Sequence, residues 1–215
     1  MFSGGKDSLA ALIRLHDNPD WRVERLITTF NESNQRTALH GTPLALLRSQ
    51  ADALELPLTE IGLPEDCDNQ TYLARVAEAL KPLRARGVEH VAFGDLFLAD
   101  IRRFREDQMR SLDMTPVFPL WHTDTSELAH EMIAAGLRAR VCCVDLQVLS
   151  ADLLGRFWSR ELLAELPDNV DPCGENGEFH TLVVDAPVMK RPLDVVTGDT
   201  HLSHDRFCML DFQPA

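Results

Sequence analysis

The chain has 215 residues, of which 45% are hydrophobic and 26% charged, and its formal net charge is −13. This length allows one large or two small domains, and the composition is that of a globular protein. A surface this acidic repels phosphate, which argues against a broad nucleic-acid interface. Since no apolar run approaches the ~20 residues of a membrane helix and no signal-peptide pattern is found, we expect a cytoplasmic protein without membrane contact.

A glycine-rich stretch opens the chain, and we call it the phosphate loop (residues 3–8). It reads Ser3, Gly4, Gly5, Lys6, Asp7, Ser8. Adjacent glycines permit positive φ and the close approach of a ligand. The apolar run at residues 9–15 predicts a helix directly after the loop. The free N–H groups and dipole of that helix, the charge of Lys6 and two serine hydroxyls together indicate a phosphate site.

The spacing of the phosphate loop differs from the Walker and the dinucleotide-binding patterns. It resembles the PP-loop of ATP pyrophosphatases, enzymes that split ATP into AMP and pyrophosphate. The alternative is a glycine-rich turn in which Asp7 or Ser8 only caps the helix.

Apolar periodicity predicts alternating strands and helices after the loop. We expect helices at residues 9–17, 42–54, 70–86 and 98–112, and strands at residues 21–30, 56–63 and 88–94. This alternation predicts an α/β domain with a Rossmann-like, mostly parallel sheet flanked by helices. Ligands bind beyond the carboxyl ends of such strands. The phosphate loop, residues 31–35 and the pair Gly94–Asp95 should therefore meet at one crevice.

The character of the chain changes after residue 112. We expect a connector with a short strand at 116–121, helices at 125–135 and 159–166, and strands at 138–149, 181–186, 193–201 and 207–212. These elements predict a smaller C-terminal α+β domain. We therefore expect a domain at residues 1–117 and a second at residues 118–215.

Only Met1 and Phe2 precede the phosphate loop, although a loop of this kind normally follows a central strand. A sheet without that strand would have two unpaired edges. We therefore expect the first strand to be truncated at the N-terminus of the recorded sequence.

A second dense motif lies at residues 171–181, where two glycines, two carboxylates and a histidine fall between Gly174 and His180. Glu175 and Glu178 can bind Mg²⁺, orient an ammonium ion or act as a general base. His180 can transfer a proton. If a strand begins at Glu178, that residue and His180 share one face. The alternative is an acidic turn before a strand.

The five cysteines form no Cys-x-x-Cys pair, so neither a zinc ribbon nor a thioredoxin-like pair is indicated. Free, mostly buried thiols in a reducing compartment are the favoured interpretation.

With both motifs in place, the sequence resembles the diphthine–ammonia ligase family, PP-loop proteins of the adenine nucleotide alpha-hydrolase-like superfamily. The matching segments are residues 3–8, His40–Gly41, residues 47–57, Gly94–Asp95 with Arg102, Arg105 and Glu106, residues 118–121 and residues 171–181. The resemblance implies an N-terminal HUP-type domain that binds ATP and a C-terminal domain that helps bind the acceptor. It also implies adenylation of a carboxylate, release of pyrophosphate, and amide formation with ammonia.

These implications give expected roles. Ser3, Gly4, Gly5, Lys6 and Ser8 would hold the β- and γ-phosphates, and Thr29, Phe30 and Gly94 would line the nucleotide site. Asp7 would bind Mg²⁺ or orient the loop, and Asp95 would bind Mg²⁺ or contact the ribose. Lys6, Glu175, Glu178 and His180 would be catalytic. His40 would lie near the nucleotide or be a surface histidine. The interpretation leaves room for a homodimer.

The acceptor stays open. In eukaryotes and archaea the resemblance implies diphthine on elongation factor 2, but compact members also occur in bacteria, which make no diphthamide. Rival functions are tRNA thiolation, a phosphoadenylylsulfate reductase, and a non-catalytic nucleotide-binding module of the universal-stress type. The first two require reactive cysteines. The third does not explain the presence of the acidic motif at residues 171–181, because a simple sensor needs no such motif.

Overall fold

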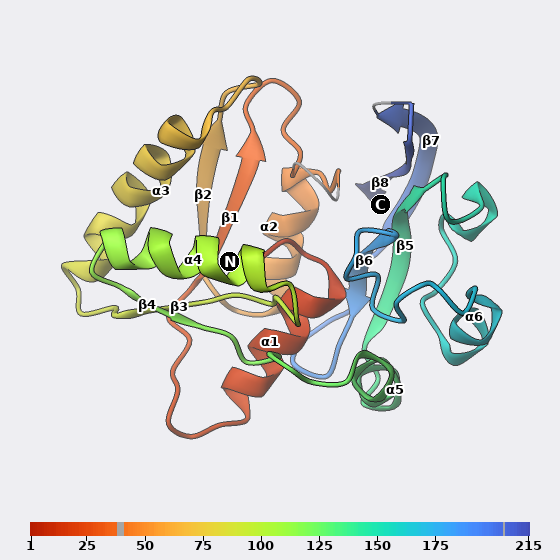
Figure 1. Ribbon diagram of the computed structural model, residues 1–215, viewed down its shortest axis with the longest axis horizontal. Helices are drawn as coiled ribbons and strands as arrows, with labels where there is room; N and C mark the ends of the chain where they lie inside the picture. Colours follow the sequence, from red (N-terminus) through yellow and green to blue (C-terminus); the bar gives the residue numbers. More distant parts are fainter. Residues whose placement is uncertain (38–40, 204) are drawn as a thin grey trace.

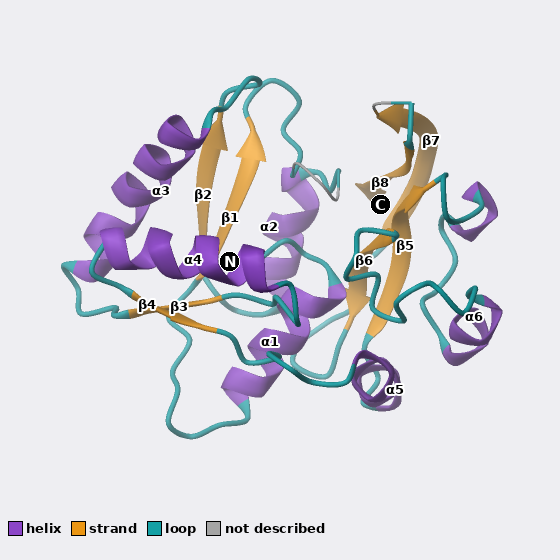
Figure 2. Cartoon of the chain, viewed as in Figure 1, coloured by secondary structure: helices purple, strands orange, loops and turns teal. Residues whose placement is uncertain are grey.

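The computed structural model describes residues 1–37, 41–203 and 205–215 (Figures 1 and 2). Its helices are α1 (Lys6–His16), α2 (Leu44–Ala53), α3 (Asn69–Arg84), α4 (Ala99–Ser111), α5 (Thr125–Ala134) and α6 (Arg160–Glu165), with a 3-10 turn η1 (Ala151–Leu153). Its strands are β1 (Leu26–Asn31), β2 (Leu58–Leu63), β3 (His90–Ala92), β4 (Thr115–Val117), β5 (Arg138–Asp145), β6 (Phe179–Asp185), β7 (Val195–Ser203) and β8 (Phe207–Pro214).

The N-terminal part contains two pairs of parallel strands, β1 with β2 and β3 with β4. Figure 1 shows β1 and β2 between α3 on one side and α2 on the other. Ile27, Ile61 and Val91 from the strands are buried in one cluster with Leu80 of α3 and Met109 of α4. Both strand pairs therefore share one core, and the predicted parallel arrangement with flanking helices is confirmed.

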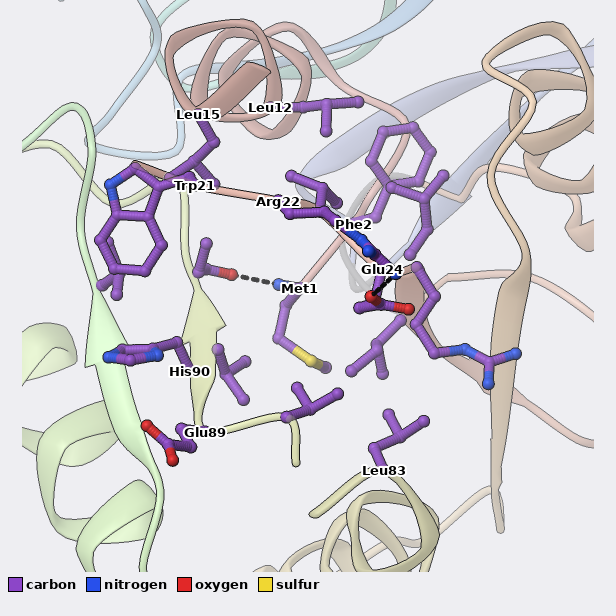
Figure 3. A pocket seen from close by; sticks show the side chains of 18 of the residues that line it. Met1, Phe2, Leu12, Leu15, Trp21, Arg22, Glu24, Leu83, Glu89 and His90 are labelled. Atoms are coloured by element: carbon purple, nitrogen blue, oxygen red, sulfur yellow. Dashed lines mark hydrogen bonds and ion pairs between the residues drawn. The ribbon is translucent and has the colours of Figure 1, made fainter. Parts of the chain in front are cut away.

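Met1 and Phe2 lie between the two strand pairs. The N–H of Phe2 donates to the carbonyl of Ile27 in β1 at 2.7 Å, and the amino group of Met1 donates to the carbonyl of Ala92 in β3. Beside them is a cavity of about 540 Å³, lined by residues of β1, β3, α1 and α3 (Figure 3). Two residues thus occupy the place at which a central strand would be expected.

The C-terminal part is built on an antiparallel sheet with the strand order β6-β5-β8-β7. The predicted α+β character is confirmed, but several element boundaries differ. The strand expected to reach residue 149 ends at Asp145, whose carbonyl accepts the N–H groups of Val148 and Leu149 and so turns the chain. Strand β6 begins two residues earlier than expected, at Phe179 instead of Thr181.

The free edge of β6 packs against the phosphate loop. The N–H of Val183 donates to the carbonyl of Gly4 at 3.0 Å, and the side-chain amide of Gln50 donates to Gly4 at 2.9 Å and to the carbonyl of Val183 at 2.7 Å. Gly4 has a φ of +80°, and a Cβ there would lie 2.5 Å from the Gln50 side chain and 2.7 Å from that of Leu47. Only glycine fits this close, left-handed turn.

One cluster of buried side chains spans both parts of the chain. Leu9 of α1 and Leu47 of α2 belong to the same cluster as Val141 of β5 and Phe179 of β6. The division at residue 117 stays a prediction. The described residues contain no helix that is long and apolar enough to cross a membrane.

Candidate active site

The phosphate loop leads directly into α1, which begins at Lys6, three residues earlier than the sequence predicts. In the first turn of a helix the N–H groups have no carbonyl partner within the helix. That of Lys6 donates to the hydroxyl of Thr181 at 3.1 Å. Among the described residues, no partner is found for the N–H groups of Asp7 and Ser8, so this turn has donors available for an anion.

Two hydroxyls lie beside those donors. Ser8 Oγ donates to the carbonyl of Gly5 at 2.9 Å and lies 3.3 Å from Ser3 Oγ, which also accepts the N–H of Gly5 at 3.4 Å. The loop therefore gathers hydroxyl and N–H groups at the positive end of the helix dipole, as an anion site requires.

The turn after β3 touches the phosphate loop at Gly94. A Cβ on this glycine would lie 2.9 Å from the carbonyl oxygen of Asp7 and 3.1 Å from the nitrogen of Ser8. Only a residue without a side chain permits this approach of two backbones. The approach brings Asp95 to the phosphate loop, so two of the three segments expected at the crevice do meet.

Asp7 and Asp95 each have a buried carboxylate oxygen without a hydrogen-bond partner among the described residues, Oδ1 and Oδ2 respectively. Burial raises the pKa of Asp95, while the charge of Arg105 opposes the rise. A buried carboxylate oxygen without a donor is costly, and carboxylate oxygens are the ligands that Mg²⁺ prefers. The pair fits a cation that arrives with the phosphates of a nucleotide.

Asp7 and Asp95 are too few ligands for a metal ion by themselves. In the part of the chain that the structure describes, no three His, Cys, Asp or Glu side chains are grouped so that they could hold an ion. Any Mg²⁺ here would need phosphate oxygens as further ligands, which is how this ion commonly binds.

The segment that carries the second motif, which we call the acidic loop (residues 171–178), is closed by Glu178. This side chain is only 5% exposed. Its Oε1 accepts the N–H of Asp171 and the Nδ2 group of Asn176, and its Oε2 accepts the N–H of Asn176, all at 3.0 Å. Because these bonds occupy both oxygens, the geometry makes Glu178 a residue that shapes the loop.

Glu175 projects from the acidic loop to the turn after β3. Its Oε1 accepts the N–H of Leu96, the neighbour of Asp95, at 2.8 Å. Burial raises the pKa of Glu175 to about 7, although the bond from Leu96 and the charge of Lys6 act in the opposite direction. A carboxyl group with such a pKa can both accept and release a proton near neutral pH.

Lys6 is enclosed, with only 2% of the residue exposed. Its ammonium donates to Asp7 Oδ2 at 2.9 Å and to the carbonyl of Cys173 in the acidic loop. It also lies 5.6 Å from the ring centre of Trp158 and 5.4 Å from that of Phe179. Burial acts to lower the pKa of Lys6, but the charge of Asp7 and its neighbours raises it overall.

The other expected residues lie farther from this centre or outside it. Phe179 and Thr181 of β6 face Lys6, so His180 between them points to the opposite face of the strand. Thr29 and Phe30 are half-buried at the carboxyl end of β1, which neighbours Phe2. His40 lies outside the described residues.

Gln50 was not singled out by the sequence, although it is 1% exposed and joins the phosphate loop to β6. The available signal was a polar residue within the apolar stripe that Leu47, Ala51 and Leu54 form on one helix. Such an interruption is ambiguous in a sequence, because a partly exposed glutamine produces the same pattern.

A helix that begins in a glycine-rich loop, two carboxylates brought together from the first turn of α1 (Asp7) and the turn after β3 (Asp95), and an adjoining acidic loop are typical of a nucleotide-binding α/β protein of the PP-loop type. A model of the diphthamide synthase N-terminal domain matches residues 1–115, and a model of the C-terminal domain matches residues 124–211. The chain belongs to the diphthamide synthase family, which includes the diphthine–ammonia ligases.

Individual relatives agree with this assignment. The diphthine–ammonia ligase of Danio rerio is 34% identical over 176 residues, which cover 79% of this chain and 68% of the relative. That of Homo sapiens is 32% identical over 118 residues, covering 52% and 44%, and that of Schizosaccharomyces pombe is 29% identical over 126 residues, covering 54% and 20%. The match thus spans less than half of the human and yeast proteins.

Substitution of Gly94 by alanine tests the contact between the two loops. The added Cβ meets the backbone of Asp7, which cannot rotate away, so we expect a loss of about 1–3 kcal/mol in unfolding free energy and about tenfold weaker nucleotide binding. Calorimetric titration with α,β-methylene-ATP and urea unfolding measure the two effects. Gly62→Ala is the matched control, because its Cβ meets only the movable side chain of Glu32. Equal behaviour of the two variants would contradict the proposed contact.

The raised pKa of Glu175 predicts a pH-dependent stability. The folded state binds the proton more tightly than the unfolded state, so this group's contribution is present below its ordinary pKa of 4.5 and is lost as the pH rises through about 7. Urea unfolding of the wild type and of Glu175→Gln, at about pH 4.5 and about pH 8, isolates the effect. We expect the variant to gain stability relative to the wild type at the higher pH. A difference that does not change with pH would contradict the shift.

Proposed function

We propose that this chain is an ATP-dependent ligase that adenylates a carboxylate and then amidates it with ammonia, releasing AMP and pyrophosphate. The observation that carries the proposal is the meeting of three segments at one place. The turn at Gly94 contacts the backbone of Asp7, and Glu175 of the acidic loop binds the N–H of Leu96 in the same turn. A phosphate site, a candidate cation site and a proton-accepting group are thereby adjacent.

In the proposed nucleotide complex, the N–H groups of Asp7 and Ser8 and the hydroxyls of Ser3 and Ser8 bind the β- and γ-phosphates. These are the donors that the first turn of α1 leaves for an anion. The adenine lies near the end of β1, beside Phe30. Donors fixed in advance around a leaving pyrophosphate stabilise the charge that develops on it.

Asp7 and Asp95 would hold Mg²⁺ through their unpaired oxygens. Such an ion supplies positive charge against the developing negative charge of the pyrophosphate.

Glu175 is the proposed base of the second step. Ammonia attacks the acyl carbon of the adenylate, the C–O bond to AMP breaks, and the proton lost from nitrogen passes to the Glu175 carboxylate. Its pKa of about 7 suits a group that accepts a proton and returns it to water near neutral pH. Glu178 would act only through the shape of the acidic loop, and the catalytic role expected of His180 stays a prediction.

The substrates would be ATP, ammonia and a carboxylate acceptor. The relatives' name, diphthine–ammonia ligase, makes diphthine the first acceptor to test. We place the protein in the cytoplasm, because its five cysteines are all free thiols, as a reducing compartment maintains them. The homodimer stays a prediction.

The rival chemistries that depend on cysteine are less well supported. Burial raises the pKa of the Cys143 and Cys173 thiols to about 12, and it also raises the pKa of the Cys142 thiol. Reactive cysteines are instead exposed and have a lowered pKa. A non-catalytic nucleotide-binding module would not account for the position of Glu175 beside the phosphate loop or for its raised pKa.

Product analysis tests the proposed function. The purified chain would be incubated with ATP, Mg²⁺, ammonium and elongation factor 2 that carries diphthine. We expect AMP and pyrophosphate in equal amounts, dependent on both the acceptor and ammonium. Glu175→Gln should bind ATP normally but turn over about 100-fold more slowly, whereas Glu78→Gln, on the exposed face of α3, should match the wild type.

Two outcomes would contradict the proposal. Formation of ADP and phosphate would exclude attack at the α-phosphate, and nucleotide binding without turnover would favour a non-catalytic module.

A further inference from the structure

Lys6 belongs to the phosphate loop, yet its ammonium is bound by groups of the protein itself. The side chain passes beneath the acidic loop, where the carbonyl of Cys173 accepts one of its N–H bonds and Asp7 Oδ2 accepts another. The rings of Trp158 and Phe179 lie within 6 Å of the ammonium, a distance at which an aromatic face stabilises a cation. These partners leave the charge satisfied without a phosphate.

The enclosure of Lys6 depends on residues from both parts of the chain. Trp158 donates its indole N–H to the carbonyl of Pro172 at 3.0 Å, which fixes one end of the acidic loop against the ring. Phe179 follows the loop directly, at the start of β6. The lysine thus fills a pocket that exists only when the acidic loop lies against the phosphate loop.

We propose that Lys6 is a positioning residue, which fastens the acidic loop to the phosphate loop and so holds Glu175 at the turn after β3, rather than a ligand of the nucleotide phosphates. This inference rests on the proposed function only where it assigns Glu175 a role in catalysis. The attachment of the acidic loop by Lys6 follows from the contacts of Lys6 in the protein without ligands.

The connection from Lys6 to Glu175 is short and rigid. Cys173 and Glu175 are two residues apart, and the backbone N–H groups of both donate to Asp171 Oδ1, at 2.8 Å and 3.2 Å. The second oxygen of Asp171 accepts the hydroxyl of Thr125 at 2.7 Å. With the loop closed in this way, moving the carbonyl of Cys173 would also move Glu175 relative to Leu96.

Lys6 also orients its neighbour Asp7. The ammonium binds Oδ2 of that carboxylate, and Oδ1 is the buried atom without a partner in the described part of the chain. Because Lys6 binds Oδ2, only Oδ1 of Asp7 is available to a cation at the phosphate loop.

Buried thiols give a direct test of the fastening. We would label the native protein with N-ethylmaleimide and follow each cysteine by mass spectrometry, comparing the wild type with Lys6→Met. The variant keeps the length and volume of the side chain but removes its charge. We expect labelling of Cys173 to become about tenfold faster, while Cys142, Cys143 and Cys208 react as slowly as in the wild type, since all four are buried.

The same variant distinguishes positioning from phosphate binding. We expect its affinity for α,β-methylene-ATP and its KM for ATP to stay within about twofold of the wild type, while kcat for the ligase reaction falls about tenfold. Lys81→Met, an exposed lysine of α3, is the control and should change none of these. Lys6→Gln, which keeps an N–H donor on a shorter side chain, gives the same comparison if Lys6→Met does not fold.

The inference would be overturned by unchanged labelling of Cys173, by equal acceleration of all four buried thiols, or by about tenfold weaker nucleotide binding with Cys173 still protected. Labelling requires no substrate. If the wild-type protein showed no ligase turnover, only the proposed function would be contradicted. The labelling rates of the cysteines would still test the role of Lys6.

Discussion

The structure depends on the pairing of the phosphate loop with the edge of β6. The carbonyl of Gly4 receives two donors, the N–H of Val183 and the side-chain amide of Gln50, while the N–H of Lys6 binds the hydroxyl of Thr181. These bonds fix the backbone of a loop that glycines would otherwise leave free to move. A strand from the C-terminal part therefore holds the conformation of the loop in which the N-terminal helix begins.

Buried charge is the second constraint on the site. Burial and nearby charges shift the pKa of Lys6, Asp95 and Glu175, and the charge of Asp7 acts on all three; burying such groups is costly unless each charge is compensated. Lys6 is compensated within the protein, whereas Asp7 and Asp95 each keep one oxygen that has no partner among the residues that the structure describes. The free protein is thus arranged so that a cation and its phosphates would complete the site, which is the preorganisation expected of a nucleotide-using enzyme.

Much of the fold could be predicted from the sequence, because apolar periodicity and turn residues are local signals. Every strand and helix expected after the phosphate loop is found, but some boundaries move by several residues: the strand expected from residue 21 begins at Leu26, and the turn at Asp145 ends β5 early. The meeting of Gly94 with Asp7 followed from the rule that loops converge at the carboxyl ends of parallel strands. The two acidic residues of the second motif could be identified as a group, but not told apart.

What the sequence could not indicate is the direction of individual side chains. Glu175 and Glu178 are equivalent in a motif, yet one reaches the turn after β3 and the other closes its own loop. The direction of Lys6 depends on Trp158 and Phe179, more than 150 positions along the chain. Such long-range packing leaves no pattern in the local sequence, and the same holds for Gln50.

A crystal structure of the chain with α,β-methylene-ATP and Mg²⁺ would test the central claim most directly. The account predicts phosphate oxygens on the N–H groups of Asp7 and Ser8, Mg²⁺ on the free oxygens of Asp7 and Asp95, and the ammonium of Lys6 still bound to the carbonyl of Cys173. A complex in which Lys6 leaves Cys173 to bind a phosphate, with the acidic loop displaced, would contradict it.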